Sequence, residues 1–212
     1  MKLLATGTIA LLLTSANLRA APMSYEVTVT NLTKAQGWGK PIVAAHNESA
    51  VLFTIGETAS AELQALAEEG DHGPLAGLWE QSVNVLEVHT GDAPLAPGQS
   101  VVYRVNTTDA MPLISLAGML GTSNDTFAAL TFTRPEVATT LYAEAYDAGT
   151  ESNNELCAFI PGPPCMNPGI RDVARAEGMV VKSNGIEGIG DLDMEVYGWD
   201  TEVLKIDITP KL

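Results

Sequence analysis

Short segments that alternate apolar and polar residues recur along the whole chain, and this pattern constrains the fold more than any other feature of the sequence. The clearest are YEVTVTNL at 25–32, SVVYRVNT at 100–107 and VLKIDIT at 203–209. Such alternation is typical of strands that bury one face. Further strands are predicted at 41–45, 51–55, 83–90, 113–120, 129–133 and 139–146. The sequence therefore predicts an all-β fold.

Helical signals are few and short. The segment SAELQALAEE at 60–69 has apolar residues on one face, Ser60 as an N-cap and Gly70 at its end. A second short helix is predicted at 168–177, which opens with a proline and is followed by Gly178. Many short strands with one or two short helices in the connections favour an antiparallel β-sandwich over alternating βαβ units.

The N-terminus has the three-part layout of a secretory signal peptide. Lys2 gives a basic start, residues 3–13 are mostly apolar, and small residues lead up to Ala20. We expect cleavage after Ala20, which makes residues 1–20 a signal peptide and residues 21–212 a single domain. An uncleaved N-terminal anchor is the alternative. No later segment is apolar for long enough to cross a bilayer, so we expect a secreted protein, either extracellular or periplasmic.

The charge balance excludes some classes of partner. The chain has 11 Lys and Arg against 26 Asp and Glu, a net charge of −15. Without Lys2 and Arg19 the mature chain carries −17. Phosphate backbones and anionic lipids would repel such a protein, so we expect no nucleic-acid partner.

Two cysteines occur, Cys157 and Cys165, in the segment CAFIPGPPC. An exported chain meets an oxidising compartment, which favours a disulfide between them. Two free thiols remain the alternative, because a loop this short can have the wrong geometry for a bond. A zinc site is not indicated, since no histidine lies nearby.

No catalytic motif is recognisable in the sequence. There is no G-x-S-x-G and no H-E-x-x-H, and His46, His72 and His89 are scattered among unrelated neighbours. The glycine-rich segment GIEGIGDLD at 185–193 lacks the strand–turn–helix context of a phosphate-binding loop. We therefore expect that the protein is not an enzyme.

The segment YDAGTESNNE at 146–155 concentrates oxygen-bearing side chains. Asp147 and Glu151 are separated by Gly149, which lets the chain fold back. Calcium requires six to eight oxygen ligands, but the EF-hand pattern does not fit this segment. From its spacing alone, a solvated acidic turn is the favoured interpretation, because Asp and Asn are common in turns.

Two motifs change this balance. SLAGMLGTSNDTFAAL at 115–130 contains an S-L-x-x-M strand and an S-x-D-x-F turn, and YDAGT follows at 146–150. In this order they resemble the spondin N-terminal domain family, the module of F-spondin that also occurs in exported bacterial proteins. The resemblance covers most of residues 24–209. It implies a β-sandwich similar to C2 domains with one calcium site.

The resemblance also implies which residues bind the metal. By position they are Asp125, Asp147 and Glu151, although animal relatives carry Asp where this chain has Glu151. The implied function is a cell-surface or extracellular-matrix adhesion module with an unidentified protein or glycan ligand. Two alternatives stay open: a purely structural envelope or matrix protein stabilised by calcium, and a secreted hydrolase that uses an acidic cluster.

Overall fold

The computed structural model describes residues 23–211, so the predicted signal peptide at 1–20 lies outside the described residues. This part of the chain forms nine strands and three short α-helices, and every strand pair is antiparallel. The predicted all-β fold is confirmed. The strands are β1 (Met23–Asn31), β2 (Ile42–His46), β3 (Val85–Thr90), β4 (Ser100–Thr107), β5 (Leu113–Met119), β6 (Thr126–Thr133), β7 (Thr139–Asp147), β8 (Val181–Lys182) and β9 (Glu202–Lys211).

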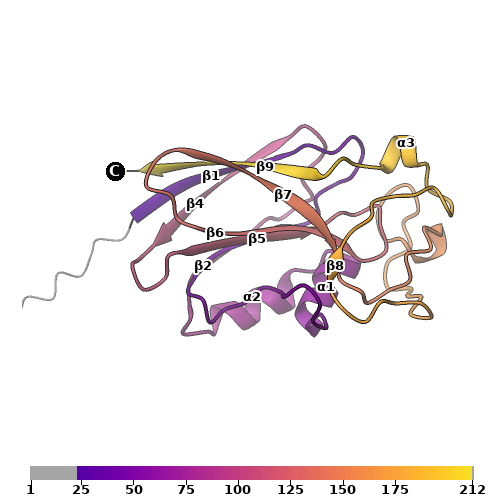
Figure 1. Cartoon of the computed structure of the whole chain (residues 1–212), viewed down its shortest axis with the longest axis horizontal. Helices are drawn as coiled ribbons and strands as arrows, with labels where there is room; N and C mark the ends of the chain where they lie inside the picture. Colours follow the sequence, from indigo (N-terminus) through magenta and orange to yellow (C-terminus); the bar gives the residue numbers. More distant parts are fainter. Residues whose placement is uncertain (1–22, 212) are drawn as a thin grey trace, which may run out of the picture.

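The nine strands belong to one sheet that folds over into two layers. The strand order is β3-β2-β5-β6-β7-β9-β1-β4, and the short β8 pairs with β7. Strands β1, β4 and β9 form one layer and β2, β5 and β6 the other, with β7 passing between them (Figure 1). The result is a β-sandwich whose long connections, which include most of residues 148–200, gather at one end (Figure 1).

The main core lies between the two layers. In β1, Tyr25, Val27 and Val29 are fully buried while their neighbours are half-buried, as the alternation in the sequence predicts. Val203, Leu204, Ile206 and Ile208 of β9 meet them from the adjacent strand, and β2, β5 and β6 close the core from the other layer.

Two helices cover the outer face of β2, β5 and β6 (Figure 1). Helix α1 (Ala61–Glu69) confirms the first predicted helix: the Ser60 hydroxyl accepts a hydrogen bond from the Leu63 N–H, and Gly70 ends the helix with φ 65°. Helix α2 (Gly73–Glu80) follows at once and buries Trp79. No helix within residues 23–211 combines the length and hydropathy needed to cross a bilayer.

The structure corrects two predicted elements. Residues 51–55 form no strand; Leu52 and Phe53 pack against the helix-covered face while Val51 and Ile55 are exposed, and the chain turns at Gly56. Residues 168–177 form no helix, and Gly169 near the predicted start has φ +75°, which a right-handed helix does not allow. Helices α2 and α3 (Met194–Tyr197) and strand β8 were not predicted.

Candidate metal centre

Sheet pairing brings the predicted ligands Asp125 and Asp147 close together. Asp125 precedes β6, and Asp147 is the last residue of β7. Because these strands are antiparallel with Thr126 opposite Asp147, the start of one lies beside the end of the other. The Ala148 N–H donates to the Asp125 carbonyl oxygen at 3.1 Å. Residues 22 positions apart in sequence thus share one end of the sandwich.

The turn after Asp147 brings Glu151 to the same place. Gly149 has φ +67°, and its N–H donates to Asp147 Oδ1 at 2.6 Å. The Thr150 and Glu151 N–H groups then donate to Asp125 Oδ2 at 2.7 and 2.9 Å, and the Thr150 hydroxyl adds a third bond. One oxygen of Asp125 therefore fastens the whole turn.

Gly149 is required for a second reason besides its backbone angle. A Cβ atom at this position would lie 2.1 Å from the carbonyl oxygen of Met179. Only glycine can both adopt the turn and admit this neighbouring backbone.

All three carboxylates are buried, and two of their oxygens lack partners. The exposed fractions are 0% for Asp125, 3% for Asp147 and 2% for Glu151. Asp125 Oδ1 and Glu151 Oε1 are buried and have no hydrogen-bond partner. A buried carboxylate oxygen without a donor is costly, so either a proton or a cation is needed to neutralise this cluster.

Burial is also the largest influence on the acidity of the cluster. It raises the pKa of Asp125, and it raises the pKa of Asp147 to about 7, with the nearby Asp125 charge adding to the effect. The pKa of Glu151 rises to about 8 through burial, then through the charges of Glu68 and Asp125, while Arg171 opposes the rise. Each shift disfavours the charged form when no cation is present.

Arg171 is only a partial counter-charge for the cluster. Its guanidinium makes two bonds to the buried Glu68, from Nε to Oε2 at 2.6 Å and from Nη2 to Oε1 at 2.7 Å. This fork geometry commits the guanidinium to Glu68. The positive charge of Arg171 near Glu151 is therefore already paired with the carboxylate of Glu68.

The donor set suits calcium, with one qualification on geometry. Every available side-chain ligand is an oxygen, as a hard cation requires. Within residues 23–211, however, no three His, Cys, Asp or Glu side chains are arranged as a ready metal cage. Both oxygens of Asp147 already accept hydrogen bonds, from Gly149 and Asn153. Asp125 Oδ1 and Glu151 Oε1 are the carboxylate oxygens of the three predicted ligands that are left without a hydrogen-bond partner.

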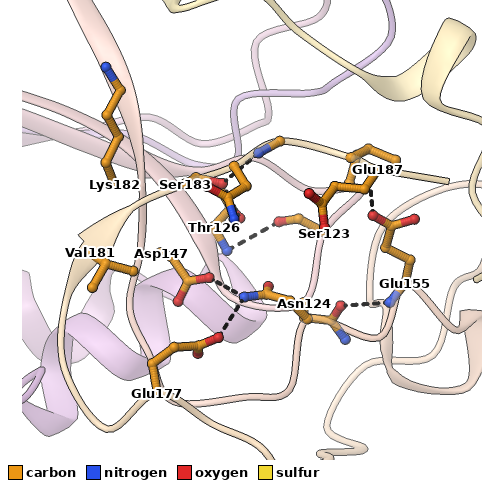
Figure 2. A pocket seen from close by; sticks show the side chains of 14 residues that line it. Ser123, Asn124, Thr126, Asp147, Glu155, Glu177, Val181, Lys182, Ser183 and Glu187 are labelled. Atoms are coloured by element: carbon orange, nitrogen blue, oxygen red, sulfur yellow. Dashed lines mark hydrogen bonds between the residues drawn. The ribbon is translucent and has the colours of Figure 1, made fainter. Parts of the chain in front are cut away.

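A polar cavity of about 270 Å³ adjoins the cluster (Figure 2). Asp147 lies in its wall, and Asn153 donates to both Asp147 and Glu177 there. The wall includes hydroxyl, amide and carboxylate groups from the start of β6 and from the loop after β8. Asp147 is the one of the three predicted ligands that borders this cavity.

Glu155 is a buried carboxylate whose role the sequence did not indicate. It has φ +54°, and its two oxygens accept the Glu187 N–H at 2.6 Å and the Ile189 N–H at 2.9 Å. Asn124 Oδ1 in turn accepts the Glu155 N–H at 3.3 Å. Glu155 thus holds the glycine-rich segment against the turn that carries Asp125.

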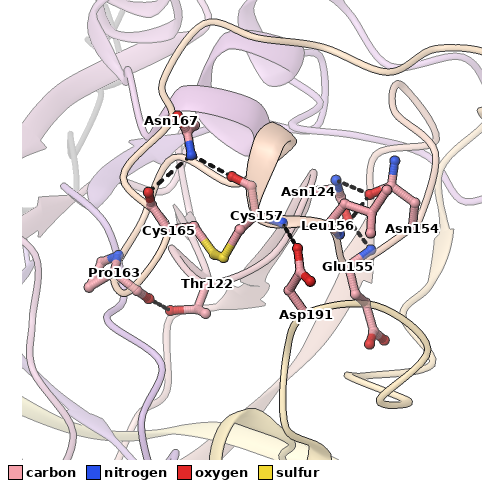
Figure 3. The surroundings of a disulfide bond; sticks show 10 residues. All are labelled: Thr122, Asn124, Asn154, Glu155, Leu156, Cys157, Pro163, Cys165, Asn167 and Asp191. Atoms are coloured by element: carbon pink, nitrogen blue, oxygen red, sulfur yellow. Dashed lines mark hydrogen bonds between the residues drawn. A yellow bond between two sulfur atoms is a disulfide. The ribbon is translucent and has the colours of Figure 1, made fainter.

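The predicted disulfide is confirmed and ties further loops to this end of the molecule (Figure 3). Cys157 and Cys165 are bonded, with their Cα atoms 4.7 Å apart. Asp191 accepts the Cys157 N–H at 2.8 Å. The Thr122 hydroxyl, three residues before Asp125, donates to the carbonyl oxygen of Pro163 inside the disulfide loop at 2.7 Å.

No protein-family model matches the chain, and no curated protein sequence matches it significantly. Membership of the spondin family stays a prediction that rests on the motifs at 115–130 and 146–155.

Proposed function

We propose that this chain is an exported calcium-binding β-sandwich that acts as a binding or adhesion module at the cell surface or in the extracellular matrix. The proposal of a metal rests on two buried oxygens without a hydrogen-bond partner, Asp125 Oδ1 and Glu151 Oε1. The metal centre itself performs no reaction.

Calcium would supply positive charge where the fold has buried negative charge. Asp125 and Glu151 belong to different loops. Burial raises the pKa of both carboxyl groups, and the charge of Asp125 raises the pKa of Asp147 and of Glu151 further. A bound cation reverses this effect, because it favours the ionised form of each ligand. Binding would therefore join the turn before β6 to the turn after β7.

Three features support export and a surface role. The signal-peptide pattern precedes the domain, the disulfide suits an oxidising compartment, and the acidic surface suits a protein that works among cations outside the cell. The spondin-like motifs favour an adhesion function with an extracellular protein or glycan as partner. This last step rests on family analogy alone.

Calorimetric titration of the chelator-stripped protein with calcium tests the metal site. We expect one saturable site in the parent, and a loss of affinity of at least about tenfold in Asp125→Asn, since the deleted charge belongs to a direct ligand. Asp207→Asn is the matched control, because Asp207 lies on β9 and pairs with Lys205. A parent that shows neither heat nor a thermal shift at millimolar calcium would refute the proposal.

A purely structural role for calcium is the second candidate. It is favoured by the three hydrogen bonds through which Asp125 Oδ2 already orders the loop. Arrays of extracellular proteins and glycans, probed with the protein in calcium and in chelator, separate the two. Calcium-dependent capture supports adhesion. If calcium raises the melting temperature but no protein or glycan on the arrays is captured, the result supports the structural role.

A further inference from the structure

Three polar side chains form a row across the helix-covered face of the sheet, away from the metal centre. They are His46 at the end of β2, Ser115 on β5 and Thr131 on β6, and Ser115 lies directly opposite Thr131 in the strand register. His46 Nε2 is 2.7 Å from Ser115 Oγ, and Ser115 Oγ is 2.6 Å from Thr131 Oγ1. The row is therefore one continuous hydrogen-bonded chain.

Elementary chemistry fixes the direction of these bonds. His46 Nδ1 lies 2.8 Å from the backbone carbonyl oxygen of Asn47, which can only accept, so Nδ1 carries the proton. In a neutral imidazole Nε2 is then an acceptor, and the Ser115 hydroxyl must donate to it. The Ser115 oxygen is left to accept the proton of Thr131.

His46 is well placed to remain neutral. It is 2% exposed, and burial lowers its pKa, while the Asn47 carbonyl acts in the opposite direction. Its ring packs against Trp79 of α2 with ring centroids 5.7 Å apart. A neutral imidazole fixed in this way can accept a proton from Ser115, the next member of the row.

Thr131 lies at the end of the hydrogen-bonded row that meets solvent. Ser115 is fully buried, whereas Thr131 is exposed and lines a cavity of about 300 Å³. The other cavity walls are mostly apolar and come from the segment after β2 and from the start of β5; they are Ala50, Val51, Leu52, Phe53 and Leu113, with His46 and Glu48. The cavity suits a small apolar group, and Glu48 together with the net charge of the chain disfavours anions.

We propose that Thr131 is a nucleophilic hydroxyl that accepts acyl groups from uncharged esters with short apolar acyl chains, with Ser115 passing its proton to His46. As in hydroxyl nucleophiles activated by a histidine, the second ring nitrogen of His46 is held by an acceptor; here Ser115 stands between the histidine and the nucleophile and relays the proton.

The transfer step balances without any other reagent. Thr131 Oγ1 forms a bond to the ester carbonyl carbon while the bond from that carbon to the leaving alcohol oxygen breaks. The Thr131 proton moves to Ser115 Oγ, and the Ser115 proton moves to His46 Nε2. The imidazolium then returns a proton to the leaving oxygen or to solvent, which leaves an acyl ester on Thr131 and a free alcohol.

The first test treats the full mature protein with p-nitrophenyl butyrate. It follows p-nitrophenol release and maps the butyryl group by mass spectrometry. We expect a butyryl ester on Thr131 that is absent in Thr131→Val, a variant that keeps the side-chain shape at an exposed position. Thr133→Val is the matched control, because Thr133 is also exposed, two residues further along the same strand. Acylation at other residues only, or equal release by Thr131→Val, would overturn the proposal.

The second test separates a proton relay from ordinary cross-strand hydrogen bonding, which also stabilises sheets. Ser115→Ala and His46→Gln are expected to lower the maximal rate constant of Thr131 acylation about 100-fold, the usual size of a general-base effect. In Ser115→Ala the ester concentration for half-maximal rate should stay within about twofold, because Ser115 does not line the cavity. Unchanged rate constants in both variants would reduce the row to a structural role and refute the relay.

Discussion

At the scale of single residues, Asp125 divides its two oxygens between two tasks. Oδ2 accepts three hydrogen bonds from Thr150 and Glu151, whereas Oδ1 is buried with no partner. A carboxylate that served only as a loop anchor would be expected to satisfy both oxygens. The asymmetry is the local reason for assigning a cation to Oδ1.

The raised pKa values predict that the metal-free protein loses stability as pH rises. Asp147 moves from 3.8 to about 7 and Glu151 from 4.5 to about 8 on folding, so the unfolded chain gives up these protons first. Their contribution is fully present below about pH 4 and is lost by about pH 8. We expect the melting temperature in chelator to fall by roughly 5–10 °C between pH 5.5 and pH 8.5.

Saturating calcium should largely remove this pH dependence, because the ion takes the place of the protons. Asp125→Asn in chelator should weaken it, since one source of repulsion is gone. A metal-free parent whose melting temperature rises between pH 5.5 and pH 8.5 would contradict the assigned burial of charge. Circular dichroism melts at several pH values make the measurement.

At the scale of elements, the caps of α1 set a local stability that can be measured. The Ser60 hydroxyl accepts the Leu63 N–H at 3.2 Å. Ser60→Ala should lower the free energy of unfolding by about 1 kcal/mol in urea, the usual worth of an N-cap. Ser49→Ala, at an exposed position outside any helix, should change it by less than about 0.5 kcal/mol. Equal effects of the two variants would contradict the cap.

We expect Glu155 to contribute more to the free energy of unfolding than the Ser60 N-cap does. Its removal leaves the partly buried Glu187 and Ile189 N–H groups without their acceptor. Glu155→Ala is expected to lower the free energy of unfolding by about 2–3 kcal/mol, measured by urea unfolding. Glu187→Ala removes an exposed carboxylate and keeps the backbone N–H that donates to Glu155, so it is the control and should be nearly neutral. A neutral Glu155→Ala would show that the glycine-rich segment is held by other contacts.

The elements that the sequence predicted are those whose signals are local. The alternating strands and α1 were predicted because burial on one face and capping are visible within ten residues. The helix expected at 168–177 is absent: Gly169 has φ +75°, and the side chain of Arg171 is bound to Glu68, a partner 103 positions away that no local pattern reveals. The strand expected at 51–55 failed because a short apolar run also suits a loop that packs under helices.

The candidate site shows the same division. Asp147 and Glu151 stood out because one short segment contains both, and Asp125 entered through a motif resemblance. The burial of all three, the unpartnered oxygens and the role of Glu155 depend on strand register and on loops that meet across the molecule. The row of His46, Ser115 and Thr131 comes from three strands, so no spacing in the sequence could indicate it.

At the scale of the whole molecule, the disulfide stabilises the end of the sandwich that carries the candidate metal centre. Asp191, Asn167 and Thr122 all bond to the backbone of residues 157–165. Replacing both Cys157 and Cys165 by Ser should lower the free energy of unfolding by about 2–3 kcal/mol in urea. The parent under reducing conditions should match the double variant. No difference between oxidised and reduced parent would contradict this contribution.

The central claim for the whole molecule is that a cation completes a fold with buried negative charge at one end. A crystal structure of the mature protein grown in millimolar calcium tests it most directly. We predict an ion bound by Asp125 Oδ1 and Glu151 Oε1, with oxygen ligands only, at about 2.3–2.6 Å. Both oxygens hydrogen-bonded to protein or water, with no ion between the two loops, would contradict the account.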